Sequence, residues 1–254
     1  MTTLKVATIN VHNRHDRWRD RRHLLVAEIL DHEPDLIALQ EVALSYRQGN
    51  WLYTQINMRT GTASRREPYR LVQQRGRGAN LYTGLAILSR MELLSYDGLS
   101  LGDGDVALRA NVLLPSGRAL DFATTRLRTG STLPETREEQ VMRLMGWLNA
   151  AGRVSLQVIA GDFNEEPHGP AVRQMRQAYR SAFALANGRE PLATYPTALV
   201  PGDNRARCLD YVFVSRGIRV SEARIFCSQA GPEDDTLYPS DHVGLLVKLE
   251  VDEK

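Results

Sequence analysis

The sequence predicts an α/β fold in which two β-sheets pack face to face and helices cover their outer faces. The first observation is that strand–helix–strand patterns occur twice along the chain, each followed by further strands. The second is that 254 residues, 43% of them hydrophobic and 24% charged, suit a soluble protein with a large core. Because no repeat, low-complexity tract or linker interrupts the chain, we expect one domain over residues 1–254.

Apolar patterning predicts the elements of the first half. Residues 4–11 alternate polar and apolar side chains, as a strand does, and residues 21–32 carry apolar side chains at helical spacing before Pro34. Residues 35–41 contain an apolar run that indicates a buried strand ending at Glu41. The other elements expected here are a helix at 51–59, strands at 69–73 and 84–89 with a loop at 75–80 between them, and a strand pair at 106–114 and 118–127.

A long helix opens the second half. Residues 133–150 carry Pro134 at the start and apolar side chains on one face, which is typical of an amphipathic helix. The elements expected after it are a strand at 156–160, a helix near 169–179, a hairpin formed by 209–215 and 218–226, and a last strand at 243–251.

The charge is nearly balanced, with a net value of +2, so the molecule as a whole is not a general electrostatic binder of nucleic acid. The positive residues are nevertheless clustered, at 14–22, 65–66, 75–77 and 205–207, and most are arginines. The planar guanidinium suits phosphate recognition. A GC-rich genome, which also favours arginine, is an equal explanation.

The cysteine content and the lengths of the apolar runs indicate in which cellular compartment the protein works. Cys208 and Cys227 flank the predicted hairpin; one disulfide and two reduced, buried thiols are the alternatives, and we expect the thiols. The N-terminus lacks the apolar core of a signal peptide, and no apolar run approaches the ~20 residues of a membrane span. We therefore expect a cytoplasmic protein.

The most informative motif is Gly161-Asp162-Phe163-Asn164, which follows a short run of β-branched residues. Two residues apart on an extended chain, the carboxylate and the carboxamide point to the same side. The carboxylate can then orient a water molecule while the amide donates to an oxygen that gains charge. Similar polar residues border the other predicted strands, namely Asn10, Glu41, Asp210, Asp241 and His242. If these strands are neighbours in two packed sheets, the side chains meet at one rim.

Hydrolysis of a phosphate ester needs this set of groups. Glu41, with Asn10 and Asp241 nearby, is an oxygen ligand suited to Mg²⁺ or Mn²⁺, which usually takes only one or two protein carboxylates. The sequence leaves open whether one ion or two would bind. An alternative for Asn10 alone is that it caps a turn.

The remaining groups are assigned to proton transfer and charge stabilisation. Asp162 would orient or deprotonate the attacking water, and Asn164 would donate to a non-bridging phosphate oxygen. A protonated His242 would bind the phosphate or act as the acid, and Asp210 would hold its imidazole. A salt bridge between Asp210 and Arg207 is the alternative.

These residues lie in motifs that resemble the endonuclease/exonuclease/phosphatase superfamily, which includes pancreatic-type deoxyribonucleases, abasic-site endonucleases, bacterial sphingomyelinases and inositol polyphosphate 5-phosphatases. The motifs follow the family's order and span residues 6 to 249: Ile9-Asn10, Gln40-Glu41, Gly84 to Arg90, Gly161 to Asn164, Leu209 to Tyr211 and Ser240 to His242. The resemblance implies a four-layer α/β sandwich of two mixed sheets and a divalent-metal phosphoesterase. It also implies the roles just given for the site residues.

One departure concerns Thr125-Arg126-Leu127, where most members of this superfamily have Thr-His-Leu and the histidine usually contacts the scissile phosphate. Arg126 can bind the same phosphate bidentately, but it is not a proton donor at neutral pH. The cysteine-containing signature typical of inositol 5-phosphatases is also absent, and Arg205 to Cys208 stand in its place.

The predicted function is hydrolysis of a phosphodiester, in nucleic acid or a nucleotide-like molecule, because of the clustered arginines and the missing 5-phosphatase signature. The enzymatic alternative is a phosphatase or phospholipase-type enzyme that acts on a small or lipid phosphate ester. The alternative of another class is a phosphate-binding protein that has lost turnover, which only Arg126 supports. His12 and His168 lie near the predicted rim but are expected to be structural. The sequence does not predict the oligomeric state.

Overall fold

The computed structural model describes residues 1–14, 17–60, 67–78, 81–130, 134–150, 154–202 and 205–252. Its strands form two six-stranded sheets, each of which contains one parallel pair among antiparallel ones. The predicted Arg65-Arg66 cluster lies outside the described residues, as does His15.

The first sheet has the order β11-β12-β1-β2-β4-β3 and the second has the order β5-β6-β7-β8-β10-β9. The strands of the first are β1 (Thr2–Asn10), β2 (Leu36–Ala43), β3 (Arg70–Arg75), β4 (Thr83–Ser89), β11 (Ile218–Phe226) and β12 (Gly244–Val251). Those of the second are β5 (Glu92–Gly102), β6 (Asp105–Leu113), β7 (Ala119–Arg126), β8 (Gln157–Asp162), β9 (Arg180–Ser181) and β10 (Asp210–Val214).

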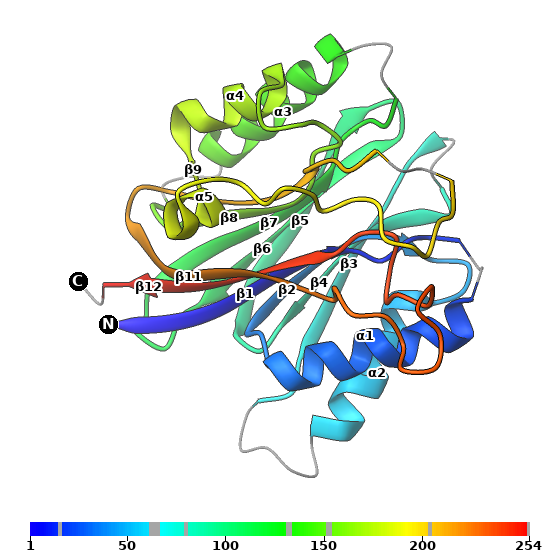
Figure 1. Ribbon diagram of the computed structural model, residues 1–254. Helices are drawn as coiled ribbons and strands as arrows, with labels where there is room; N and C mark the ends of the chain where they lie inside the picture. The colour runs from blue at the N-terminus through cyan, green and yellow to red at the C-terminus, as the bar shows by residue number, and fades with distance from the viewer. Residues whose placement is uncertain are drawn as a thin grey trace.

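Helices cover both outer faces of the paired sheets (Figure 1). The first sheet carries α1 (Trp18–His32) and α2 (Gln48–Thr60), and the second carries α3 (Pro134–Ala150) and α4 (Pro170–Ala178). The short α5 (Ala182–Asn187) packs near β10 and β11. The predicted four-layer sandwich of two mixed sheets is therefore confirmed.

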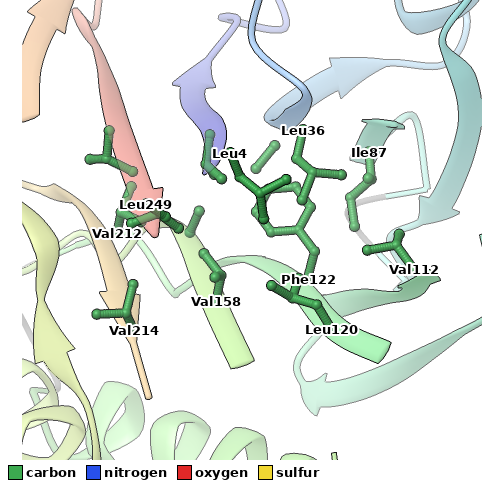
Figure 2. Close-up of a cluster of buried hydrophobic side chains, with 14 of the residues drawn as sticks. Leu4, Leu36, Ile87, Val112, Leu120, Phe122, Val158, Val212, Val214 and Leu249 are labelled. Atoms are coloured by element: carbon green, nitrogen blue, oxygen red, sulfur yellow. The ribbon is translucent and has the colours of Figure 1, made fainter. Parts of the chain in front are cut away.

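Three apolar clusters fill the spaces between the four layers. The largest lies between the sheets and includes Leu4, Phe122 and Val158 (Figure 2). The other two lie between each sheet and its helices. In β2, Leu36 and Ala38 belong to the cluster between the sheets, whereas Ile37 and Leu39 belong to the helix-side cluster. Burial on both faces explains why the sequence of this strand is apolar without alternation.

The structure also contains elements that the sequence patterns did not predict. Strand β5 is mostly exposed at a sheet edge, so it lacks the apolar alternation of a half-buried strand. Helix α5 has six residues, too few for a helical period to emerge. It is capped by Ser181, whose hydroxyl accepts from the Ala184 amide at 3.4 Å.

The cysteine and membrane predictions have simple outcomes. Cys208 and Cys227 are free and buried, in the clusters on opposite outer sides of the paired sheets, so the disulfide alternative is wrong. Among the described residues, no helix combines the length and apolar character needed to cross a membrane.

Candidate active site

Strand pairing brings the predicted site residues to one rim of the sandwich, at the opposite end of the sheets from the two termini (Figure 1). In the first sheet, Asn10 at the end of β1 lies beside Gln40 of the parallel strand β2. In the second sheet, Asp162 at the end of β8 pairs with Arg126 on one side and with Asp210 on the other. Residues far apart in the chain therefore end at the same edge.

Glu41 reaches this rim because strand β2 has a bulge. The pairing of β2 with β4 shifts register between Leu39 and Val42, and Glu41 has a left-handed backbone with φ 54°. Leu39 and Val42 both pack in the helix-side cluster, although strict alternation would place them on opposite faces. A single extra residue of this kind redirects a side chain, and a non-glycine residue at positive φ is a common feature of functional sites.

The Gly161-Asp162-Phe163-Asn164 motif is also fixed by its backbone. A Cβ atom at Gly161 would lie 2.1 Å from the Thr125 carbonyl oxygen of the neighbouring strand, so only glycine fits. Asn164 has φ 48°, and its amide N–H donates to Asp162 Oδ1 at 2.8 Å. Its side-chain amide donates to the Leu127 carbonyl at 2.8 Å.

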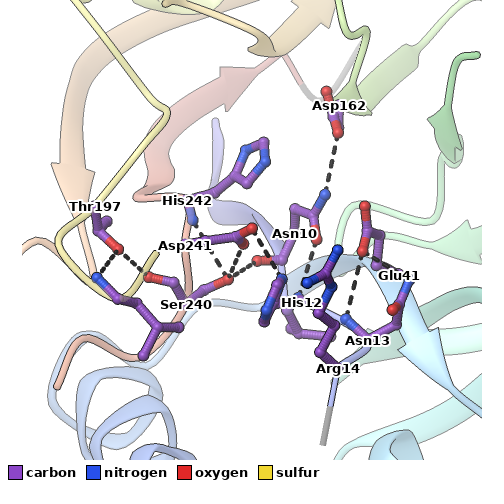
Figure 3. A network of polar contacts seen from close by, with 12 residues as sticks. Asn10, His12, Asn13, Arg14, Glu41, Asp162, Thr197, Ser240, Asp241 and His242 are labelled. Carbon is purple, nitrogen blue, oxygen red and sulfur yellow. Dashed lines mark hydrogen bonds and ion pairs between the residues drawn. The ribbon is translucent and has the colours of Figure 1, made fainter. Parts of the chain in front are cut away.

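Asn10 lies at the centre of the polar network between Asp162, Glu41 and Asp241 (Figure 3). Its Nδ2 donates to Asp162 Oδ2 at 3.1 Å, and its Oδ1 accepts from the His12 amide at 3.0 Å. Asn10 is 1% exposed. It therefore holds the end of β1 against the end of β8 and joins the two sheets at the rim.

Glu41 is held by groups from the segment after β1 and from the second sheet. Its Oε2 accepts from Asn13 Nδ2 at 2.8 Å, and its Oε1 lies 2.7 Å from Arg126 Nη2. Burial by itself would raise the pKa of Glu41, but the Arg126 guanidinium and a hydrogen bond from Asn10 bring that pKa below its ordinary value. The carboxylate is therefore ionised at neutral pH.

Asp241 is a buried carboxylate that also has polar and charged neighbours. Its Oδ2 lies 2.8 Å from His12 Nδ1, and its Oδ1 accepts from the Ser240 hydroxyl at 3.2 Å. Burial opposes ionisation, yet the hydrogen bond from His12 and the charge of His242 lower the pKa of Asp241.

His242 forms a buried pair with Asp210. Its Nδ1 lies 2.8 Å from Asp210 Oδ2, and its ring centroid is 4.8 Å from that of Tyr195. Burial would lower the pKa of His242, but the charge of Asp210 and the hydrogen bond to it raise that pKa to about 10. The imidazole is therefore a cation at neutral pH.

Asp162 behaves differently from the other rim carboxylates. Burial raises the pKa of Asp162 to about 6, and the neighbouring charge of Asp210 acts in the same direction. His242 and Arg126 oppose the rise without cancelling it. A carboxylate with a pKa near 6 is ionised at neutral pH and still accepts a proton readily.

The rim encloses a cavity of about 420 Å³. Six of the predicted site residues line it: Glu41, Arg126, Asp162, Asn164, Asp241 and His242. The other two, Asn10 and Asp210, are buried behind it and contact the lining residues through side-chain hydrogen bonds.

Other lining residues were not predicted as site residues. They are His12, Asn13, Arg14, Thr129, Gly130, Tyr195, Val200, Arg207 and Leu209. His12 was expected to be structural, and its place two residues after Asn10 was the available signal. His168 instead lines a separate surface hollow.

The oxygen atoms of Glu41, Asn10 and Asp241 are the donor chemistry that Mg²⁺ and Mn²⁺ prefer. Within the described ranges, no group of three His, Cys, Asp or Glu side chains is arranged to hold a metal ion. This does not conflict with magnesium, which commonly takes one or two carboxylates and keeps several waters. Glu41 lines the cavity and is ionised, so these residues fit such an ion.

Nocturnins of two organisms are similar to this chain in sequence. Nocturnin of Drosophila melanogaster is 31% identical over 168 residues, which cover 60% of this chain and 25% of that protein. Nocturnin of Xenopus laevis is 23% identical over 257 residues, which cover 93% of this chain and 66% of that protein. The chain thus spans between a quarter and about two thirds of the length of these relatives.

Solved structures share the fold. The human Nocturnin catalytic domain with bound sulfate anion has a TM-score of 0.78 at 21% identity and covers 99% of this chain and 94% of its own. TDP2 of D. rerio, complexed with a single-strand DNA product, has a TM-score of 0.79 at 16% identity and covers 99% of this chain and 100% of its own.

A family model supplies the assignment. The model of the Endonuclease/Exonuclease/phosphatase family matches residues 7–242, which contain every predicted site residue and nearly the whole sandwich. The chain belongs to the Endonuclease/Exonuclease/phosphatase family.

Proposed function

We propose that this protein is a divalent-metal-dependent phosphoester hydrolase. The observation that carries the proposal is one cavity lined by an ionised Glu41, by Asp162 with a pKa of about 6, and by a His242 cation. Nucleases and phosphatases, which give the family its description, both hydrolyse phosphoesters.

The side chains in the cavity have different roles in the reaction. Asp162 accepts a proton from the attacking water, because its pKa allows both the ionised and the protonated form near neutral pH. His242, held by Asp210, gives a proton to the leaving oxygen as the bond between that oxygen and phosphorus breaks. Asn164, which lines the same cavity, donates a hydrogen bond to a non-bridging phosphate oxygen as charge develops on it. A divalent ion held by Glu41, with Asn10 and Asp241 nearby, would supply further neutralisation of the phosphoryl oxygens.

We propose a phosphodiester in nucleic acid or a nucleotide-like molecule as the substrate. Three arginines, Arg14, Arg126 and Arg207, line the cavity. They suit a substrate with more than one anionic group, since guanidinium groups bind phosphates in a planar, bidentate manner. The complex of D. rerio TDP2 with a DNA product is in keeping with this proposal.

The test is turnover of bis(p-nitrophenyl) phosphate and p-nitrophenyl phosphate with Mg²⁺ or Mn²⁺. We expect metal-dependent cleavage of the diester that Asp162→Ala abolishes and that Asp31→Asn retains, because Asp31 lies at the far end of α1 with a side chain 79% exposed. Turnover of the monoester alone would favour the phosphatase alternative. No turnover across DNA, abasic DNA, RNA, phosphoinositides and sphingomyelin would favour the phosphate-binding alternative.

The single domain and the cytoplasmic location remain parts of this proposal. Limited proteolysis that yields one resistant core of nearly full length, and recovery of the protein in the cytosolic fraction of cells, are the expected results. Two separable fragments or recovery outside the cytosol would contradict them.

A further inference from the structure

Arg126 lines the cavity and connects the two sheets. It extends from the end of β7 in the second sheet, and its Nη2 lies 2.7 Å from Glu41 Oε1 in the first. Its Nε lies 3.8 Å from Asp162 Oδ2. The Arg126 side chain is 23% exposed, against 14% for Glu41 and 1% for Asp162. One guanidinium therefore balances two carboxylates that are largely removed from water.

Glu41 has protein donors at both of its oxygens. Asn13 Nδ2 donates to Oε2 at 2.8 Å, and Arg126 occupies Oε1. Arginine stays protonated in proteins, so this cation does not leave Glu41 by losing its proton. Since a buried carboxylate without a partner is costly, the pair with Arg126 stabilises the metal-free protein.

We propose that Arg126 competes with a divalent metal ion for Glu41, and that a phosphate group in the cavity relieves this competition by accepting the Arg126 guanidinium. This inference rests on the proposed function, because it takes Glu41 as the metal ligand. A metal ion and a guanidinium repel each other at a single carboxylate oxygen, so metal binding alone must break the ion pair. A bound phosphate offers Arg126 a second anion of matching geometry.

The consequence is positive cooperativity between metal and phosphate. Phosphate draws Arg126 from Glu41 and frees an oxygen for the metal, and the metal frees Arg126 for phosphate. Such coupling is reciprocal and typically changes an affinity by about 5- to 150-fold. The arrangement keeps the metal site weak until a substrate phosphate arrives.

The experiment measures Mn²⁺ binding by electron paramagnetic resonance, with and without inorganic phosphate at a concentration that leaves Mn²⁺ soluble. In the wild type we expect phosphate to tighten Mn²⁺ binding by about tenfold or more. In Arg126→Met we expect tight Mn²⁺ binding without phosphate and no further effect of phosphate. In Arg126→Lys, which keeps the positive charge, we expect weak binding and retained coupling.

A matched control is Arg128→Met, which removes an arginine of the same segment that pairs with Asp103 and Asp105 and does not line the cavity. We expect this variant to behave as the wild type does. Unchanged Mn²⁺ affinity in Arg126→Met overturns the inference. An absence of phosphate coupling in the wild type also overturns it. This measurement does not depend on the folding of any variant.

Glu41→Gln separates this inference from the proposed function. If Glu41→Gln leaves Mn²⁺ affinity unchanged, then Glu41 is not the metal ligand and the metal assignment of the proposed function fails. If Glu41→Gln weakens Mn²⁺ binding while Arg126→Met does not strengthen it, the metal assignment stands and only the competition by Arg126 is wrong.

Discussion

The two sheets contribute carboxylates of opposite character to the same rim. From the first sheet and the turn before β12, Glu41 and Asp241 have pKa values lowered by neighbouring donors and cations, although both are largely buried. From the second sheet, Asp162 is 1% exposed and has its pKa raised to about 6. Under the proposed function, carboxylates with pKa values moved apart in this way have different roles: Glu41 and Asp241 would hold a cation, and Asp162 would accept a proton.

The largest expected effect is the loss of turnover when Asp162, the proposed proton acceptor, is replaced. Asp162→Asn should lower turnover of a phosphodiester by about 10²- to 10⁴-fold, because it removes the proton acceptor and keeps the shape of the side chain. Its affinity for Mn²⁺ should remain within a few-fold of the wild type, in contrast to Glu41→Gln, which should lose affinity. Steady-state kinetics and Mn²⁺ titration measure the two quantities. Equal losses of metal affinity in both variants would break the comparison.

A smaller effect is expected for the buried pair of Asp210 and His242. Asp210 stabilises the charged imidazole, so Asp210→Asn should lower the pKa of His242 from about 10 towards the ordinary value near 6.5. With a pKa near 7, about a tenth of the imidazoles would be charged at pH 8, and turnover there should fall by about tenfold. An NMR titration of the His242 ring in the metal-free protein measures the pKa. A titration that stays near 10 in the variant would assign the shift to other neighbours.

Binding of a metal ion at Glu41, without a contribution from Asp162, should raise the thermal stability of the protein. At a free Mn²⁺ concentration of 100 times Kd, binding to the folded state contributes about 2.7 kcal/mol, or roughly 5–10 °C in Tm for a chain of this size. The rise should be reversed by a chelator, retained in Asp162→Asn and lost in Glu41→Gln. Differential scanning calorimetry with and without the chelator provides the measurement. A rise that survives in Glu41→Gln would place the ion elsewhere.

An effect away from the rim concerns the two thiols, which lie on opposite outer sides of the paired sheets. Burial raises the pKa of Cys208 to about 12 and that of Cys227 well above its ordinary value. Above pH ~8.5 the unfolded chain loses these protons while the folded chain keeps them, so the free energy of unfolding should fall as pH rises. Urea unfolding at pH 8 and pH 10 measures the fall. The Cys208→Ala/Cys227→Ala double variant should show a shallower fall, and an identical one would contradict the assignment.

Much of the fold was readable from local patterns. The apolar run in β2 and the alternation in β1 predicted these strands, because their burial depends on faces that repeat along a few residues. Patterns failed where burial does not repeat, as in the exposed edge strand β5. The aromatic side chain of Tyr82 is 72% exposed. It stands in the turn before β4, where no periodicity fixes a side chain.

The candidate site was readable in part for a related reason. Polar residues at the ends of apolar strands, such as Asn10 and Asp162, predicted a rim, because strands of one sheet bring their ends to a common edge. The positions of His12 beside Asp241 and Asn13 beside Glu41 were not predicted. Both residues lie in the segment after β1, whose path depends on contacts with other parts of the chain.

The sequence by itself determined the layers of this protein, the family and the residues that end each strand, since these follow from local periodicity and short motifs. Only the tertiary structure decided that Arg126 pairs with Glu41, that a bulge turns Glu41 to the rim, and that Asp162 differs from the other carboxylates. The physical reason is that pairing and burial of charges depend on distances between the two sheets. Those distances are set when about 250 residues pack into four layers, and no short stretch of the chain contains them.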